Sequence, residues 1–211
     1  MTAKGAAPAE PKRYDSAYFE RWYRRSSVGV GRSEFVERKV RLALAAADFV
    51  LCRPTRSVLD VGCGEGPWRS VLRRLRPDIA YLGVDSSEYA IKRWGRVRNL
   101  RQGSLGDLER LRLAKCYDLV VCADVLHYVS DEEARMGLAS LARRTEGVAF
   151  IEAFANTDEI EGDRAGFQDR SPEAYAMLLE AAGFVPLGLH LYVTREGSET
   201  LVAGERGISR R

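Results

Sequence analysis

The 211-residue sequence has few of the residues that bind metals, with four cysteines and two histidines. No two cysteines form a CxxC pair, so the common spacing of zinc ligands is absent and we expect no metal site. Cys116 and Cys122 flank an apolar segment. The sequence therefore predicts that these two thiols are reduced and buried.

No hydrophobic run is long enough to cross a bilayer. The longest, residues 42–51, is interrupted by Asp48 and is about half the length that a membrane span needs. The first eleven residues lack the apolar centre of a secretory signal. We therefore expect a cytoplasmic protein without a membrane partner.

The sequence also lacks a strong charge of one sign, with a net charge of +3. Its basic residues are spread along the chain, which is typical of solvated helix surfaces, whereas nucleic-acid binders concentrate them on one face. A nucleic-acid partner is thus not expected. With 45% hydrophobic residues, the composition is that of an ordinary globular domain.

The first third of the chain divides into three parts. Residues 1–12 are rich in Ala and Pro and are predicted to be a disordered tail. Residues 13–53 are predicted to form a helical lid with one aromatic helix over 14–25, a flexible link over 26–31 and a second helix over 33–51. The buried side of the second helix is expected to carry Val36, Val40, Leu44 and Ala47.

From residue 54 to residue 211 the chain reads as one domain in which short strands alternate with helices. The predicted strands are 57–61, 80–84, 97–101, 117–122 and 147–153, and the predicted helices are 67–76, 87–94, 106–113, 131–144 and 171–182. Such alternation produces a parallel sheet with helices on both faces. Two further strands, 185–194 and 199–202, are joined by so short a link that they must be antiparallel. The expected fold is a Rossmann-like three-layer α/β sandwich with a mostly parallel seven-stranded sheet.

The strongest motif is VLDVGCGEG at residues 58–66, in which a strand leads into three alternate glycines and then a helix. Glycines there allow a tight turn and the close approach of a ligand. A dinucleotide site would have a further glycine where Pro67 stands, and proline offers no N–H to a phosphate. NAD is therefore disfavoured, although a NAD-linked oxidoreductase stays open as an alternative.

A second motif, YLGVDSS at residues 81–87, places Asp85 at the end of the next strand, beside the glycine loop. A carboxylate there can accept hydrogen bonds from both hydroxyls of a ribose. Alternatively, Asp85 caps the helix that begins near Ser87.

These motifs resemble those of the class I S-adenosylmethionine-dependent methyltransferases, and the resemblance extends from Ser57 to Val202. YDLVVCADVLHYV at residues 117–129 is similar to the fourth-strand motif of that family. The resemblance implies a transferase with S-adenosylmethionine as cofactor. Many relatives have an aspartate where Ser104 stands. The cofactor-binding residues that the resemblance implies are Asp60, Gly62, Cys63, Gly64, Trp68, Asp85, Ser86, Gly103, Ser104, Leu105, Ala123 and Asp124.

For the acceptor side, His127 is the candidate general base because its ordinary pKa lies near neutrality, with Asp124 or Glu152 to orient it. The alternative is a histidine that only packs beneath the lid. The candidate substrate pocket consists of Tyr14, Tyr18, Trp22, Tyr23, Tyr128 and Glu152. These aromatic residues could close over a cationic or aromatic acceptor, or could simply dock the first helix.

The acceptor class is narrowed by residues 122–125, which read CADV without proline. Relatives that methylate base or amide nitrogens carry Asn or Asp before two prolines, so the expected acceptor is an O, N or S atom of a small molecule. An RNA or protein acceptor, and a cofactor-binding regulator without catalysis, remain alternatives. The oligomeric state, monomer or homodimer, stays open.

Overall fold

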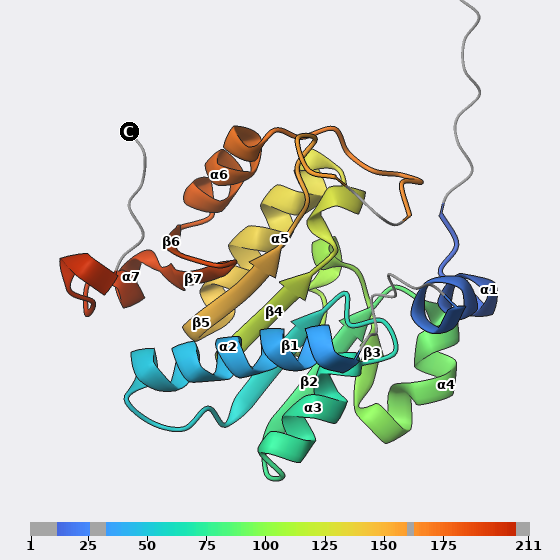
Figure 1. Cartoon of the computed structure of the whole chain (residues 1–211), viewed down its shortest axis with the longest axis horizontal. Helices are drawn as coiled ribbons and strands as arrows, with labels where there is room; N and C mark the ends of the chain where they lie inside the picture. The colour runs from blue at the N-terminus through green and yellow to red at the C-terminus, as the bar shows by residue number, and fades with distance from the viewer. Residues whose placement is uncertain (1–11, 26–32, 160–162, 206–211) are drawn as a thin grey trace, which may run out of the picture.

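The computed structural model describes residues 12–25, 33–159 and 163–205, and the fold is built on a single sheet (Figure 1). Its strand order is β3-β2-β1-β4-β5-β7-β6. The strands are β1 (Ser57–Val61), β2 (Ala80–Asp85), β3 (Leu100–Gln102), β4 (Tyr117–Ala123), β5 (Thr145–Glu152), β6 (Phe184–Gly188) and β7 (Leu191–Thr194). Strands β1 to β5 pair in parallel, and β7 is antiparallel to both β5 and β6. The predicted fold class is confirmed.

Helices cover both faces of the sheet. They are α1 (Ser16–Phe19), which continues as a π-helical turn (Glu20–Arg25), α2 (Ser33–Leu51), α3 (Pro67–Leu75), α4 (Glu88–Arg98), α5 (Asp131–Arg144), α6 (Pro172–Ala181) and α7 (Arg195–Ser198). The core on one face joins the sheet to α2, α3 and α4, and the core on the other joins it to α5 and α6. No helix in the described ranges has both the length and the apolar character to cross a membrane.

Helix α2 has the bounds and the buried side that the sequence predicts. Val36, Val40, Leu44 and Ala47 are each at most 5% exposed. They recur every three or four residues, so they form one stripe that packs on the sheet.

The third strand was placed too early. Helix α4 continues to Arg98, and β3 begins only at Leu100. Between them, Asn99 adopts a left-handed conformation with φ of 56° and donates a side-chain hydrogen bond to the Tyr81 carbonyl at 2.6 Å. The end of α4 therefore depends both on the local preference of asparagine for this conformation and on a contact with the neighbouring strand β2.

The C-terminal hairpin also differs from the prediction. The turn lies within the run predicted as one strand, because Gly188, Leu189 and His190 all have positive φ. The predicted link is instead the short helix α7, capped by Thr194, whose Oγ1 accepts the Gly197 N–H at 3.1 Å. Residues 199–202 form no strand.

Two smaller predictions were wrong. Cys116 is exposed, whereas Cys122 is buried as predicted. The helix expected over 106–113 is a single 3₁₀ turn, Leu105–Asp107, which begins at a capping box formed by Ser104 and Asp107. The predicted link over 26–31 and nearly all of the predicted tail lie outside the described residues.

Candidate active site

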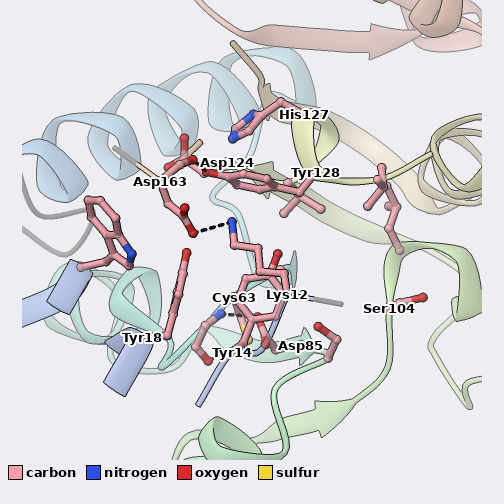
Figure 2. Close-up of a pocket in the computed structure, with 18 of the residues that line it drawn as sticks. Lys12, Tyr14, Tyr18, Cys63, Asp85, Ser104, Asp124, His127, Tyr128 and Asp163 are labelled. Carbon is pink, nitrogen blue, oxygen red and sulfur yellow. Dashed lines mark hydrogen bonds and ion pairs between the residues drawn. The ribbon is translucent and has the colours of Figure 1, made fainter. Parts of the chain in front are cut away.

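The carboxyl ends of β1, β2 and β4 open into one cavity of about 690 Å³ (Figure 2). Its lining includes the loops after these strands, the N-terminal segment, α2 and residues 163–168. Ligands of open α/β sheets bind at this edge, where neighbouring loops diverge.

The glycine loop after β1 takes a path that only glycine follows without strain. Gly62, Gly64 and Gly66 have φ values of 73°, 54° and 77°. A Cβ on Gly62 would lie 2.0 Å from a methyl group of Val125. The Gly62 N–H donates to the Val84 carbonyl at 2.8 Å, which holds the loop against β2. The backbone of the loop therefore faces the cavity.

Asp85 ties the end of β2 to this loop. Its carboxylate accepts the N–H groups of Gly64 at 2.6 Å and Ser87 at 2.8 Å, and it is 8% exposed. Burial raises the pKa of Asp85, which the two hydrogen bonds counteract. The cap of α4 is Ser87, whose Oγ accepts the Ala90 N–H at 3.0 Å, so the capping role does not fall to Asp85.

Asp60 lines the cavity and is buried near Asp85. It accepts a hydrogen bond from the Tyr81 hydroxyl at 2.7 Å, and burial raises the pKa of Asp60 to about 7. Cys63 and Trp68 line the same part of the cavity, and Trp68 packs on Phe150 at 5.2 Å between ring centroids.

The loop after β3 forms the next wall. Gly103 donates its N–H to the Asp85 carbonyl at 3.0 Å, which fixes the loop beside β2. Ser104 donates its hydroxyl to the Asp107 carboxylate at 3.0 Å. Leu105 is buried, and all three residues line the cavity together with the exposed Ser86.

The end of β4 carries a strained residue. Asp124 has a φ of 60°, which costs a non-glycine residue of order 1–3 kcal/mol and tends to be retained at functional sites. Its N–H donates to the Glu152 carbonyl at 3.1 Å. Burial, followed by the charge of Glu152, raises the pKa of Asp124 to about 6. The Glu152 carboxylate in turn pairs with Lys39 of α2.

His127 lines the cavity but is only 2% exposed. Its ring packs among those of Tyr128, Phe154 and Phe167, and its Nδ1 accepts the Phe154 N–H at 3.4 Å. Burial, assisted by the charges of Lys12 and Arg170, lowers the pKa of His127 to about 4. The described part of the chain shows no hydrogen bond from His127 to Asp124 or Glu152.

The N-terminal segment closes the cavity. Phe19 is 1% exposed and lies against Tyr23, with 4.8 Å between ring centroids. The Tyr23 hydroxyl lies over the glycine loop, since a Cβ on Gly64 would approach it to 2.3 Å. The Tyr14 carbonyl accepts the Ser87 hydroxyl at 2.5 Å, and Tyr18 and Trp22 complete the wall.

The chain also matches a family model. A methyltransferase domain model matches residues 31–189. The chain belongs to this methyltransferase family. It is an S-adenosylmethionine-dependent methyltransferase of class I.

The relatives and the solved structure to which this chain is similar are named as methyltransferases. Trans-aconitate 2-methyltransferase of Deinococcus radiodurans is 28% identical over 74% of this chain and 70% of its own length. A malonyl-[acyl-carrier protein] O-methyltransferase of Herminiimonas arsenicoxydans is 28% identical over 80% and 68%. The solved magnesium protoporphyrin IX methyltransferase of Synechocystis PCC 6803, with bound S-adenosylhomocysteine, has a TM-score of 0.57 and 23% identity over 81% of this chain and 86% of its own.

The methyltransferase places every sequence-predicted site residue except Glu152 on the cavity lining, and Glu152 contacts Lys39, which is on it. Three further lining residues were not predicted from the sequence, namely Lys12, Lys39 and Phe154. Only Lys39 could have been found from the sequence, because it follows Val36 by three residues and so lies on the buried side of α2. The others reach the cavity from segments without a recognisable motif.

Proposed function

We propose that this methyltransferase transfers a methyl group from S-adenosylmethionine to an O, N or S atom of a small molecule. The observation that carries the proposal is one cavity of about 690 Å³ that reaches from the glycine loop to the rings of the N-terminal segment. Small-molecule sites have volumes of about 300–1,000 Å³. The printed name of one relative, which acts on trans-aconitate, supports a small-molecule acceptor, whereas that of another gives a malonyl group carried on an acyl-carrier protein.

The residues that line the cavity are suited to S-adenosylmethionine. We assign Asp85 to the ribose hydroxyls, because its buried carboxylate has lone pairs beyond the two that accept N–H groups. The loop of Gly62, Cys63 and Gly64, with Asp60 beneath it, would hold the methionine part. The adenine would lie along Ser86 and residues 103–105. Ala123 and Asp124 would border the amino-acid end, and Trp68 the wall beside it.

Bound S-adenosylmethionine supplies an electrophilic methyl group, so the chain must chiefly position the acceptor and exclude water. Positioning alone supplies up to about 7–11 kcal/mol of a reaction barrier. Tyr14, Tyr18, Trp22, Tyr23 and Tyr128 would enclose the acceptor. His127 is neutral at pH 7 and has a pKa of about 4, so as a base it would serve only acceptors that readily lose a proton. Asp124, with a pKa of about 6, is the stronger base of the two.

The test has two stages. Calorimetric titration with S-adenosylmethionine, S-adenosylhomocysteine and NAD should show binding of the first two in preference to NAD. Release of S-adenosylhomocysteine is then measured with a panel of small alcohols, acids, thiols and amines. Preferential binding of NAD would overturn the proposal. Turnover that is found only with RNA, and that weakens steeply from 50 to 200 mM salt, would mean that the acceptor is a nucleic acid.

We further propose that the enzyme is cytoplasmic.

A further inference from the structure

The acceptor side of the cavity contains a lysine of the chain itself, surrounded by aromatic rings. The Lys12 ammonium lies 3.3 Å from the ring centroid of Tyr128, 5.3 Å from that of Tyr14 and 5.5 Å from that of Tyr18 (Figure 2). Cations are attracted to the faces of aromatic rings within about 6 Å, and several rings together form the cage that recognises alkylammonium groups.

A carboxylate completes this cage. Asp163 pairs with the Lys12 ammonium at 2.8 Å, and the two side chains are only 16% and 14% exposed. The Tyr128 hydroxyl donates to the Asp163 carbonyl at 2.6 Å, which fixes ring and carboxylate relative to each other. Burial lowers the pKa of Lys12, with Asp163 opposing this effect. The cage thus holds an amino group in a largely dehydrated place.

The other charges on this side of the cavity also favour a cation. Lys39 is neutralised by Glu152, as Lys12 is by Asp163. Asp124 adds a further carboxylate, and no ion pair of Asp124 occurs within the described ranges. His127 is neutral at pH 7. The carboxylate of Asp124 would therefore repel an incoming carboxylate and attract an ammonium group.

We propose that the rings of Tyr14, Tyr18 and Tyr128 with the carboxylate of Asp163 bind the amino group of the methyl acceptor, and that Lys12 occupies this place until the acceptor displaces it. The substrate class is a small primary or secondary alkylamine. This inference rests on the proposed function and narrows its acceptor atom to nitrogen.

Methyl transfer to the amine proceeds in two steps. The alkylammonium first releases a proton to water, which frees the nitrogen lone pair. That pair forms the new bond to the methyl carbon while the carbon–sulfur bond breaks, and the electrons of the broken bond remain on sulfur. The products are the N-methylated ammonium and S-adenosylhomocysteine. Rings around the nitrogen stabilise the cationic product as well as the cationic acceptor.

The test measures binding and so does not depend on finding the natural acceptor. The complex with S-adenosylhomocysteine is titrated calorimetrically with n-butylammonium chloride, 1-butanol and sodium butyrate, which share one carbon skeleton. We expect n-butylammonium to bind most tightly, and Lys12→Ala to tighten its binding roughly 3- to 30-fold, the range for a cation held against rings. Lys12→Arg, which keeps a cation in the cage, is the matched control and should bind it no better than the native chain.

The cage itself is tested in the Lys12→Ala background. Tyr128→Leu should weaken n-butylammonium binding several-fold more than Tyr128→Phe, which keeps the ring face. Asp163→Asn should weaken it while leaving 1-butanol unchanged. Equal or tighter binding of butyrate, or no effect of Lys12→Ala, would overturn the inference.

Two further observations separate the possible failures. If S-adenosylhomocysteine itself does not bind, the proposed function fails first. If it binds and turnover is found only with acids or alcohols, the proposed function stands and the amine is excluded. Mass spectrometry after incubation with S-adenosylmethionine alone should show unmodified Lys12. A methyl group on Lys12 would mean that the cage serves the chain's own lysine and would also overturn the inference.

Discussion

The two sides of the cavity are built in different ways. On the cofactor side, the backbone of loops directly after β1, β2 and β3 forms the surface, and its hydrogen bonds join Gly62, Gly64 and Gly103 to β2. On the acceptor side, the surface consists of side chains from the N-terminal segment, α2, the turn after β4 and residues 163–168. The first side follows from local motifs, whereas the second exists only once distant segments meet.

The largest effect on this difference between the two sides is expected from Gly64→Ala, which changes the backbone-built cofactor side. An alanine would have to adopt the left-handed backbone of Gly64, and its Cβ would collide with the Tyr23 hydroxyl. Together these should weaken S-adenosylmethionine binding by about 3 kcal/mol, or roughly 100-fold, in calorimetry. Gly66→Ala is the control, because φ is also positive there but nothing lies nearer than 3.5 Å. Equal binding by the two variants would contradict a loop that is shaped for close approach.

Acid stability tests the acceptor side. The pKa of His127 is lowered from 6.5 to about 4, so its neutral form stabilises the fold above pH 6.5 and this contribution is lost as the pH falls towards 4. The native chain should lose about 3 kcal/mol more free energy of unfolding over that interval than His127→Gln, by denaturant titration. His190→Gln, in which a half-exposed histidine is replaced, should behave like the native chain. A parallel loss in His127→Gln would show that His127 is not responsible.

The substitution Asp85→Ala tests the cofactor side of the cavity. Removal of the carboxylate leaves the Gly64 and Ser87 N–H groups without their acceptor and removes the proposed ribose partner. We expect S-adenosylmethionine binding to weaken by about 1–3 kcal/mol. Glu88→Ala, at an exposed position in the first turn of α4, is the matched control. Unchanged affinity in the Asp85 variant would exclude Asp85 from the site.

The smallest effect is expected where the two sides meet, at Asp124. With a pKa of about 6, Asp124 is charged at pH 8 and largely neutral at pH 5. Its charge should favour the cationic cofactor by about 1 kcal/mol, so Asp124→Asn should weaken binding at pH 8 but not at pH 5. Calorimetry at both pH values checks this, and an equal effect at both would mean that the charge of Asp124 is not involved.

The accuracy of the sequence predictions follows the same division. Helix α2 was placed correctly because its apolar stripe fixes one buried side. The strand near Asn99 and the turn at Gly188, Leu189 and His190 were misplaced because three of these four left-handed residues are not glycines, so the local signals for a helix end or a turn are weak there. Lys12 and Asp163 are 151 positions apart in the chain and meet only in the folded cavity.

The amino-acid sequence by itself determined the parallel sheet, the glycine loop and the acid beside it, because each depends on residues adjacent along the chain and on conformations that few residue types adopt. Only the tertiary structure decided that Ser87 caps α4, that His127 is buried and neutral, and that Lys12 lies among three tyrosines. Those features depend on how far water is excluded and on which distant side chains face each other, and spacing along a chain contains neither quantity.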